Sequence, residues 1–263
     1  MAESNTSHTD QTGGVAVVHK HRTREWIVIV AASAVVLLVG SYVVPRILSL
    51  TWYRTPGKPL PSYPTGTLRD KTIVINPGHA GRGPGAVGPT GLAEVNVNLD
   101  VARRCSLLLK SFGAHVFLQA AGDADLNEVF WEAKRLQPDL WVSVHHNSAP
   151  RTWPIVLWRN RSEVYYSASK TTDAAKESEK AAQAIARHLG QHLGLSAQTF
   201  AETERKHLEA GTGTFTAVLV EASYISNPFQ ERLLAMPAKR ELEARAICAG
   251  VLDYFVGQTR RVR

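Results

Sequence analysis

Residues 72–91 read TIVINPGHAGRGPGAVGPTG, and this stretch decides the fold of the chain. It opens with Ile73, Val74 and Ile75, β-branched residues that fit a buried strand. It then breaks at a Pro-Gly turn, which places His79 just past the strand end. In open α/β sheets, ligands bind in the crevice beyond the carboxyl ends of the strands. His79 is therefore a candidate metal ligand or base.

Downstream of this stretch, helical and strand-like periods alternate, which is the pattern of an α/β domain. The residues predict strands at 114–119, 140–145 and 217–221, and helices at 93–112, 126–136, 172–193, 229–234 and 238–256. Segments 155–158 and 163–167 are expected to form a hairpin or extra strands. We therefore expect a single domain over residues 70–258, with a mostly parallel, twisted sheet flanked by helices.

The N-terminal part of the chain differs in character from the domain. Residues 1–25 are polar with a basic cluster, and we expect a disordered cytoplasmic tail. Trp26 to Val44 is a run of nineteen residues without a charge, so we expect one transmembrane helix as an anchor over residues 26–46. The run is longer than a signal-peptide core and lacks a cleavage site, which favours an uncleaved anchor over a secreted form. Residues 47–69 are rich in proline and predict an extended linker.

The formal net charge of +7 is confined to the two ends of the chain. Residues 1–69 hold seven Lys/Arg against three Asp/Glu, the tail adds Arg260, Arg261 and Arg263, and the residues between are balanced. A basic face for nucleic acid is therefore not expected, whereas anionic lipid or wall polymer suits the terminal charges. Three basic residues lie on each side of the uncharged run at residues 26–44, so we infer the orientation in the membrane from the function instead.

Candidate site residues stand at the ends of the predicted elements. They are His79 after the first strand, Glu94 in the first turn of the following helix, His145 and His146 at the end of the third strand, and Glu221 at the end of the fourth. In a parallel sheet these side chains converge on one rim. Two histidines and a carboxylate, with a position left for water, form the ligand set of hydrolytic zinc sites. Because magnesium and calcium prefer more oxygen ligands, zinc is the expected metal.

Three stretches carry a resemblance to a known family: INPGHAGRGPGAVGPTGLAEVNVNLDVA, SVHHN and VLVEASYISNP. They resemble signatures of the zinc-dependent N-acetylmuramoyl-L-alanine amidases, cell-wall hydrolases that cut the amide between muramic acid and L-alanine. The resemblance covers residues 70 to 256. It implies that His79, Glu94 and His145 bind zinc. It also implies that Glu221 is the catalytic carboxylate, which takes a proton from zinc-activated water and gives it to the leaving amine.

The chain departs from the family pattern at several positions. Asn76 stands where the family has Asp, Gln119 lies near the place of an arginine, and Trp131 and Glu132 lie where another arginine is usual. An amide can orient a ligand by hydrogen bonding but brings no charge. We therefore expect these departures to affect the zinc affinity or the rate. Strand alternation turns His146 away from the side of His145, so one of the two reaches the metal, and the family match selects His145.

The expected function is that of a membrane-anchored peptidoglycan hydrolase whose catalytic domain lies outside the cytoplasm. Two other functions stay open: a weakly active or inactive wall-binding module of the same fold, and a zinc peptidase acting on the stem peptide, which would share every ligand. Each site residue also has an ordinary structural explanation. Glu94 suits a helix start, His145 a hydrogen-bonded strand end, and Glu221 a paired charge at the rim.

Two further sets of residues have structural explanations in preference to functional ones. Cys105 and Cys248 both fall on predicted helices, and we expect buried free thiols rather than a disulfide. The aromatic residues after the third strand are expected to pack in the core rather than to form a groove wall for sugar or peptide; they are Trp153, Trp158, Tyr165 and Tyr166.

Overall fold

The computed structural model describes residues 26–37, 40, 61–119, 126–150, 156, 159–168, 172–202 and 215–259. The chain divides into two compact units, Met1–Thr55 and Pro56–Arg263. In the first unit a helix covers residues 26–37 and leaves its apolar side chains exposed, with Trp26 at 64% and Ile27 at 67%. Among the described residues, no helix is long and apolar enough to cross a bilayer. The expected tail 1–25, residues 38, 39 and 41–46 of the expected anchor, and the linker up to residue 60 lie outside the described residues.

The second unit contains one six-stranded sheet with the strand order β2-β1-β3-β6-β4-β5. The strands are β1 (Thr72–Pro77), β2 (His115–Leu118), β3 (Leu140–Asn147), β4 (Arg161–Ser167), β5 (Ser196–Glu202) and β6 (Ala217–Tyr224). Neighbouring strands are parallel everywhere except between β4 and β6, which run antiparallel. The predicted α/β domain is therefore confirmed, with a sheet that is mixed because β4 reverses direction.

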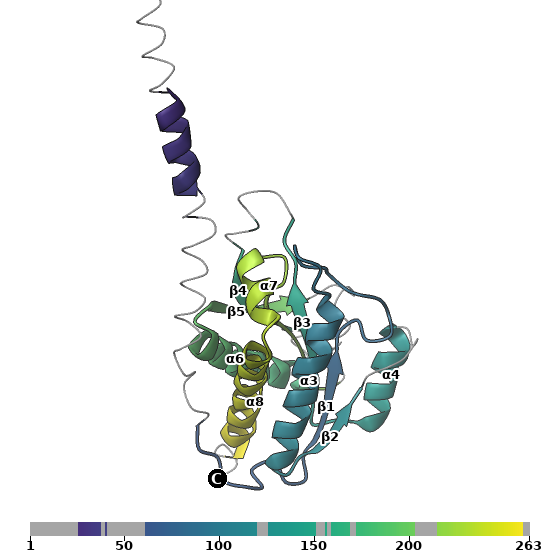
Figure 1. Cartoon of the computed structure of the whole chain (residues 1–263). Coiled ribbons are helices and arrows are strands. Elements are labelled where there is room, and N and C mark those ends of the chain that lie inside the picture. The colour runs from purple at the N-terminus through teal and green to yellow at the C-terminus, as the bar shows by residue number, and fades with distance from the viewer. Residues whose placement is uncertain are drawn as a thin grey trace, which may run out of the picture. The chain divides into compact units, whose positions relative to one another are not determined.

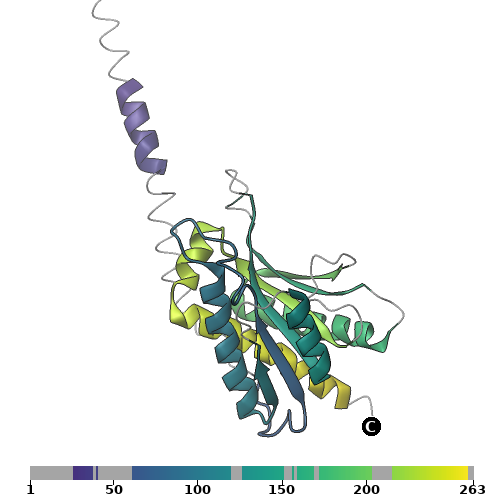
Figure 2. The same ribbon diagram turned by 90° about the vertical axis from the view of Figure 1, so that its right-hand side faces the viewer.

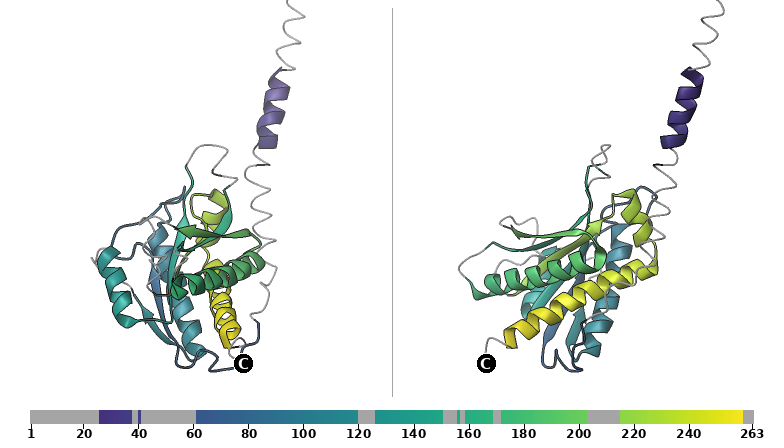
Figure 3. Two further views of the ribbon diagram at one scale, coloured as in Figure 1. Left: turned by 180° about the vertical axis from the view of Figure 1, so that it is seen from behind. Right: turned by 90° about the vertical axis from the view of Figure 1, so that its left-hand side faces the viewer.

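Helices cover both faces of this sheet (Figure 1). They are α3 (Glu94–Ser111), α4 (Leu126–Leu136), α6 (Asp173–Leu193), α7 (Pro228–Leu234) and α8 (Pro237–Thr259). Figure 2 shows α3 and α4 on opposite faces of the sheet, and Figure 3 shows α6 running beside α8. The order of the elements agrees with the sequence pattern, and α7 and α8 each begin at a proline, which is favoured in the first helical turn because its missing N–H needs no partner there.

Two apolar clusters fill the space between sheet and helices. The larger joins residues such as Ile73, Val142 and Val220 to α3, α6 and α8. The smaller joins Val74 and Trp141 to α4 on the other face. Successive side chains of a strand point to opposite faces, which is why neighbours such as Val142 and Trp141 belong to different clusters. The same alternation continues to the end of β3, where the candidate ligands stand.

Strand β5 was not predicted from the sequence. Its residues, SAQTFAE, are mostly small or polar, so they lack the apolar run of a central strand. The strand lies at the edge of the sheet and pairs with β4 alone, where a polar composition costs little. The expected strand at 163–167 is confirmed as part of β4, while the segment at 155–158 lies outside the described residues except for Val156.

Candidate metal centre

The loop after β1 brings His79 over the end of the neighbouring strand β3. Gly78 donates its N–H to the carbonyl of Val144 at 2.9 Å, which ties the loop to β3. His79 itself adopts a left-handed backbone conformation with φ of 65°, which is uncommon for a residue with a side chain. The Pro-Gly turn thus places the imidazole at the carboxyl ends of β1 and β3, as the sequence predicted.

Glu94 is the first residue of α3, and its carboxylate is almost completely buried. Its Oε2 accepts a hydrogen bond from the backbone N–H of Ala86 at 2.9 Å, and its Oε1 accepts from Asn98 Nδ2 at 3.1 Å and from the backbone N–H of His146 at 3.2 Å. A carboxylate in the first turn also faces the positive end of the helix dipole. These contacts hold both oxygens at the rim of the sheet.

Both predicted histidine ligands contact this carboxylate. His145 Nδ1 lies 3.1 Å from Glu94 Oε1, and His79 Nε2 lies 3.3 Å from Glu94 Oε2. The two imidazole rings stand edge to face, with centroids 5.1 Å apart. Burial alone would raise the pKa of Glu94, but the hydrogen bonds and charges of His145 and His79 outweigh it and hold the pKa well below its ordinary value. Glu94 is therefore an ionised carboxylate between two nitrogen donors.

Two glycines make room for this arrangement. A Cβ on Gly78 would lie 2.2 Å from Cε1 of His145, and a Cβ on Gly85 would lie 2.7 Å from both Glu94 Oε2 and His79 Cδ2. Gly85 also has a φ of 66°, which a residue with a side chain rarely adopts. The Pro-Gly turn and the Gly-rich loop are thus required by the close approach of the ligand side chains.

The donor set fits a zinc ion. One donor atom from each of His79, Glu94 and His145 lies within 4.8 Å of the other two. Ligand atoms about 2.1 Å from a tetrahedral zinc ion lie about 3.4 Å from one another. The imidazole-to-carboxylate separations are close to that value, at 3.1 Å from His145 to Oε1 of Glu94 and 3.3 Å from His79 to Oε2. Two nitrogens and one oxygen leave a fourth position for water or substrate. The residues that the sequence selected as ligands therefore come together and could hold a metal.

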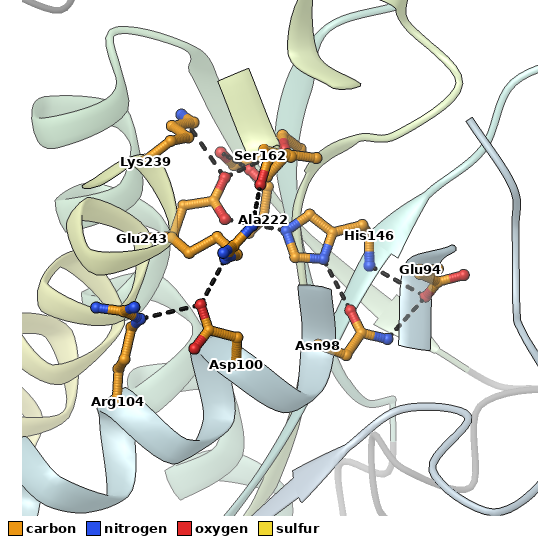
Figure 4. Close-up of polar contacts among 12 residues, drawn as sticks. Glu94, Asn98, Asp100, Arg104, His146, Ser162, Ala222, Lys239 and Glu243 are labelled. Carbon is orange, nitrogen blue, oxygen red and sulfur yellow. Dashed lines mark hydrogen bonds and ion pairs between the residues drawn. The ribbon is translucent and has the colours of Figure 1, made fainter. Parts of the chain in front are cut away.

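His146 lies on the other side of β3, as strand alternation predicted. Its Nδ1 is 2.8 Å from Asn98 Oδ1, and its Nε2 is 3.0 Å from Glu243 Oε2 of α8. Figure 4 shows these residues in line from Glu94 into the interior. Asn98 and Glu243 were not singled out in the sequence. The spacing of Glu94 and Asn98, four residues apart on one helix, is the signal that could have found Asn98.

Glu221 lies on the strand next to His145, outside the group of three ligands. The two residues are register partners in the parallel pair of β3 and β6, so their side chains project from the same face of the sheet. Glu221 is half-buried. The structure thus places a fourth ionisable side chain beside the candidate metal centre.

Three of the positions that depart from the family pattern are joined to one another. Asn76 accepts a hydrogen bond from Ser143 Oγ at 2.9 Å and donates to the carbonyl of Gln119 at 3.4 Å. The side chain of Gln119 donates to Glu132 at 2.8 Å and to the carbonyl of Val129 at 2.7 Å. With Ser143 of β3, these departures form one polar chain from β1 through the residue after β2 to α4, without a positive charge among these side chains.

The remaining expectations concern cysteines and aromatic residues. Cys105 and Cys248 are both buried and free, as predicted. Tyr166 packs against the larger apolar cluster, and Tyr165 stacks on Phe200 with ring centroids 5.3 Å apart. Trp153 and Trp158 lie outside the described residues. Core packing is thus confirmed for Tyr166.

Comparison with known proteins identifies relatives of this chain. Residues 73–253 match the family model described as N-acetylmuramoyl-L-alanine amidase. The amidase LytC of Bacillus subtilis is 33% identical over 190 residues, which cover 70% of this chain and 36% of LytC. The probable cell wall amidase LytH of Staphylococcus epidermidis is 28% identical over 196 residues, which cover 74% of this chain and 62% of LytH. The chain therefore spans from about a third to three fifths of the length of these relatives.

Solved structures show the same architecture. The N-acetylmuramoyl-L-alanine amidase AmiC2 of Nostoc punctiforme superposes with a TM-score of 0.60 at 26% identity, over 73% of this chain and 98% of that one. Ami1 from Mycobacterium smegmatis gives a TM-score of 0.61 at 22% identity, over 73% of this chain and 99% of that one, and this second likeness shows the fold alone.

Proposed function

This chain belongs to the N-acetylmuramoyl-L-alanine amidase family, and from that premise we propose that it is a peptidoglycan hydrolase that cleaves the amide between N-acetylmuramic acid and L-alanine. The observation that carries the proposal is the cluster of His79, Glu94 and His145 at the rim of the sheet, with Glu221 on the neighbouring strand. The match to the family model spans all four residues, which supports the assignment.

We propose that His79, Glu94 and His145 hold a zinc ion. When bound, zinc supplies a Lewis acid that polarises a carbonyl and activates water at neutral pH. The chain contributes the geometry: Gly78 and Gly85 leave space for the imidazoles and the carboxylate, and the Ala86 N–H and Asn98 fix the two oxygens of Glu94. A ligand set that is held in place before the metal arrives loses little conformational freedom on binding it.

Glu221 is the proposed general base and acid. Because it projects from the same face as His145, it can take the proton of the attacking water and hand it to the nitrogen of the leaving L-alanine amine. This second step is needed because an amide nitrogen is expelled as a neutral amine rather than as an anion.

The test is digestion of purified peptidoglycan by the wild-type chain and by Glu221→Gln, with the products identified by mass spectrometry. We expect intact stem peptides with a free alanine amine from the wild type. The Glu221→Gln variant should lose activity by a factor of about 10² or more, as for removal of a proton-transfer group, and keep its zinc. Glu241→Gln, a change at a partly exposed residue of α8 that pairs with Arg104, is the matched control and should digest like the wild type.

Three outcomes would contradict the proposal. Fragments cut within the stem peptide would identify a zinc peptidase. Binding to peptidoglycan without products would identify a wall-binding module. Products that persist unchanged in Glu221→Gln would remove Glu221 from the mechanism and leave the bond specificity intact.

We infer further that residues 26–46 anchor the protein in the cell membrane and that the hydrolase domain faces the cell wall. The uncharged run from Trp26 to Val44 and the exposed apolar side chains of residues 26–37 support an anchor. The substrate is extracytoplasmic, which supports the orientation. Cell fractionation tests the anchor: the full chain should need detergent for extraction, whereas a chain lacking residues 1–46 should not. Protease added to intact spheroplasts should degrade the domain, and protection of the domain would contradict the orientation.

A further inference from the structure

We propose that Asn98, His146 and Glu243 form a buried relay of positioning residues that fixes the Glu94 carboxylate for metal binding. The proposal rests on the zinc site described above, and it concerns side chains that the mechanism does not otherwise use. All three are at most 1% exposed, and they connect α3, β3 and α8 in that order. Figure 4 shows the relay leading from Glu94 to Glu243.

The orientation of Asn98 follows from its partners. Its Nδ2 lies 3.1 Å from the carbonyl of Gly78 and 3.1 Å from Glu94 Oε1, and both of these oxygens accept hydrogen bonds. Both amide hydrogens are therefore committed, and Oδ1 is the atom that faces His146. Asn98 thus joins the Glu94 carboxylate to the turn that carries His79. The orientation of the Asn98 amide group depends in turn on the hydrogen-bond partner of its Oδ1.

His146 is the hydrogen-bond partner of Asn98 Oδ1. Its Nδ1 lies 2.8 Å from Asn98 Oδ1, and its Nε2 lies 3.0 Å from Glu243 Oε2, so both ring nitrogens face acceptors. A ring with a fixed partner at each nitrogen has one orientation. The backbone N–H of His146 also donates to Glu94 Oε1 at 3.2 Å. One residue therefore supports the ligand both directly and through Asn98.

Glu243 is fixed at the far end of the relay. Its Oε1 accepts from Ser223 Oγ at 3.2 Å and lies 3.6 Å from Lys239 Nζ. Burial alone would raise the pKa of Glu243, but the charges of His146 and Lys239 outweigh it and lower the pKa. Buried ion pairs add little net stability compared with apolar residues of the same size. A role in positioning explains why this part of the core is polar.

The test measures the affinity of the full chain for Zn²⁺ by competition with a chromophoric chelator. His146→Ala should weaken binding by about 10- to 100-fold, the usual cost of removing a residue that orients a metal ligand. The matched control is Asp100→Asn. Asp100 also lies on α3 and is paired with Arg240 of α8, but its contacts lead away from Glu94. The control should bind zinc within about twofold of the wild type, because a partly exposed pair contributes little.

A double variant separates positioning from stability. In His146→Leu combined with Glu243→Gln, the imidazole is removed, while the amide at residue 243 can still contact Lys239 and Ser223, so that neither is left buried without a partner. We expect this variant to keep its cooperative unfolding and still lose about 10- to 100-fold in zinc affinity. In a chain that already carries Asn98→Ala, the same two changes should cause little further loss, since the relay acts through Asn98. Activity lost at limiting zinc should return at saturating zinc.

Two results would overturn the inference in distinguishable ways. A folded double variant that binds zinc as tightly as the wild type would show that the relay does not position Glu94, and the zinc site would stand. A wild-type chain that binds no zinc would remove the metal centre itself and the relay with it.

Discussion

Two buried carboxylates of the domain, Glu94 and Glu163, look alike at first and differ in what surrounds them. Glu94 lies between His79 and His145 at the rim. Glu163, on β4, accepts hydrogen bonds from Tyr165 Oη at 2.6 Å, Tyr224 Oη at 2.8 Å and Asn147 Nδ2 at 2.7 Å, and pairs with Arg161. In both cases burial alone would raise the pKa, and the hydrogen bonds of the partners lower it.

The difference lies in the chemistry of the partners. Imidazole nitrogens can exchange a hydrogen bond to a carboxylate for a bond to a metal, whereas hydroxyl, amide and guanidinium donors in this arrangement cannot. Burial and a lowered pKa therefore do not by themselves identify a metal ligand. The Glu163 cluster is expected to stabilise the β4 half of the sheet, and the Glu94 cluster to bind zinc.

The largest expected effect is on zinc binding. Glu94→Gln should weaken zinc affinity by more than the roughly 100-fold that marks the upper range for residues outside the ligand set. Glu163→Gln should bind zinc like the wild type but lose about 2–3 kcal/mol of unfolding free energy, less than the cost for a fully buried pair because Arg161 is partly exposed. Chelator competition and urea denaturation measure the two quantities. An equal loss of zinc affinity in both variants would show that the two carboxylates do not differ in metal binding.

Zinc removal should distinguish the two clusters by their stability. A ligand at about 1,000 times its dissociation constant stabilises the folded state by about 4 kcal/mol. Chelation should therefore lower the melting temperature of the wild type and of Glu163→Gln alike, and leave Glu94→Gln unchanged. Differential scanning calorimetry with and without chelator measures this. A chelator effect that persists in Glu94→Gln would place the metal elsewhere.

The two carboxylates should contribute in the same way to the pH dependence of the unfolding free energy. Each has a pKa that is lower in the folded state than its ordinary value of 4.5, so each stabilises the protein above that pH and loses this contribution as pH falls through the folded-state pKa. In zinc-free protein, Glu94→Gln and Glu163→Gln should each flatten the decline in unfolding free energy below pH 4.5, by of order 1–3 kcal/mol. Denaturation curves at successive pH values test this, and an unchanged slope would contradict the assigned pKa direction.

The smallest effect concerns the start of α6, which carries no residue of either cluster. Thr172 caps α6, and its side chain accepts a hydrogen bond from the Ala175 N–H at 3.2 Å. Thr172→Ala should lower the unfolding free energy by about 1 kcal/mol, the usual cost of losing a cap, with no change in zinc affinity. Urea denaturation and chelator competition measure both. A change in zinc affinity here would mean that stability and metal binding are not separable in this domain.

The four candidate site residues were recognisable in the sequence because each stands at the end of a regular element. Strand ends and a helix start are marked by local patterns, and a parallel sheet brings strand ends to one rim whatever the details of packing. The same local reasoning missed β5, whose polar residues carry no strand pattern, and it did not anticipate the antiparallel direction of β4.

The sequence by itself thus determined the α/β order of elements, the ligand types and the side of β3 on which each histidine lies, because these depend on periods of two and 3.6 residues and on turn chemistry. Only the tertiary structure decided which partners the buried polar groups have. Glu243 lies 97 residues from His146 along the chain, and Asn98 lies 48 residues from it. Such contacts arise where α8 and α3 pack against β3, and no local pattern in the chain encodes that packing.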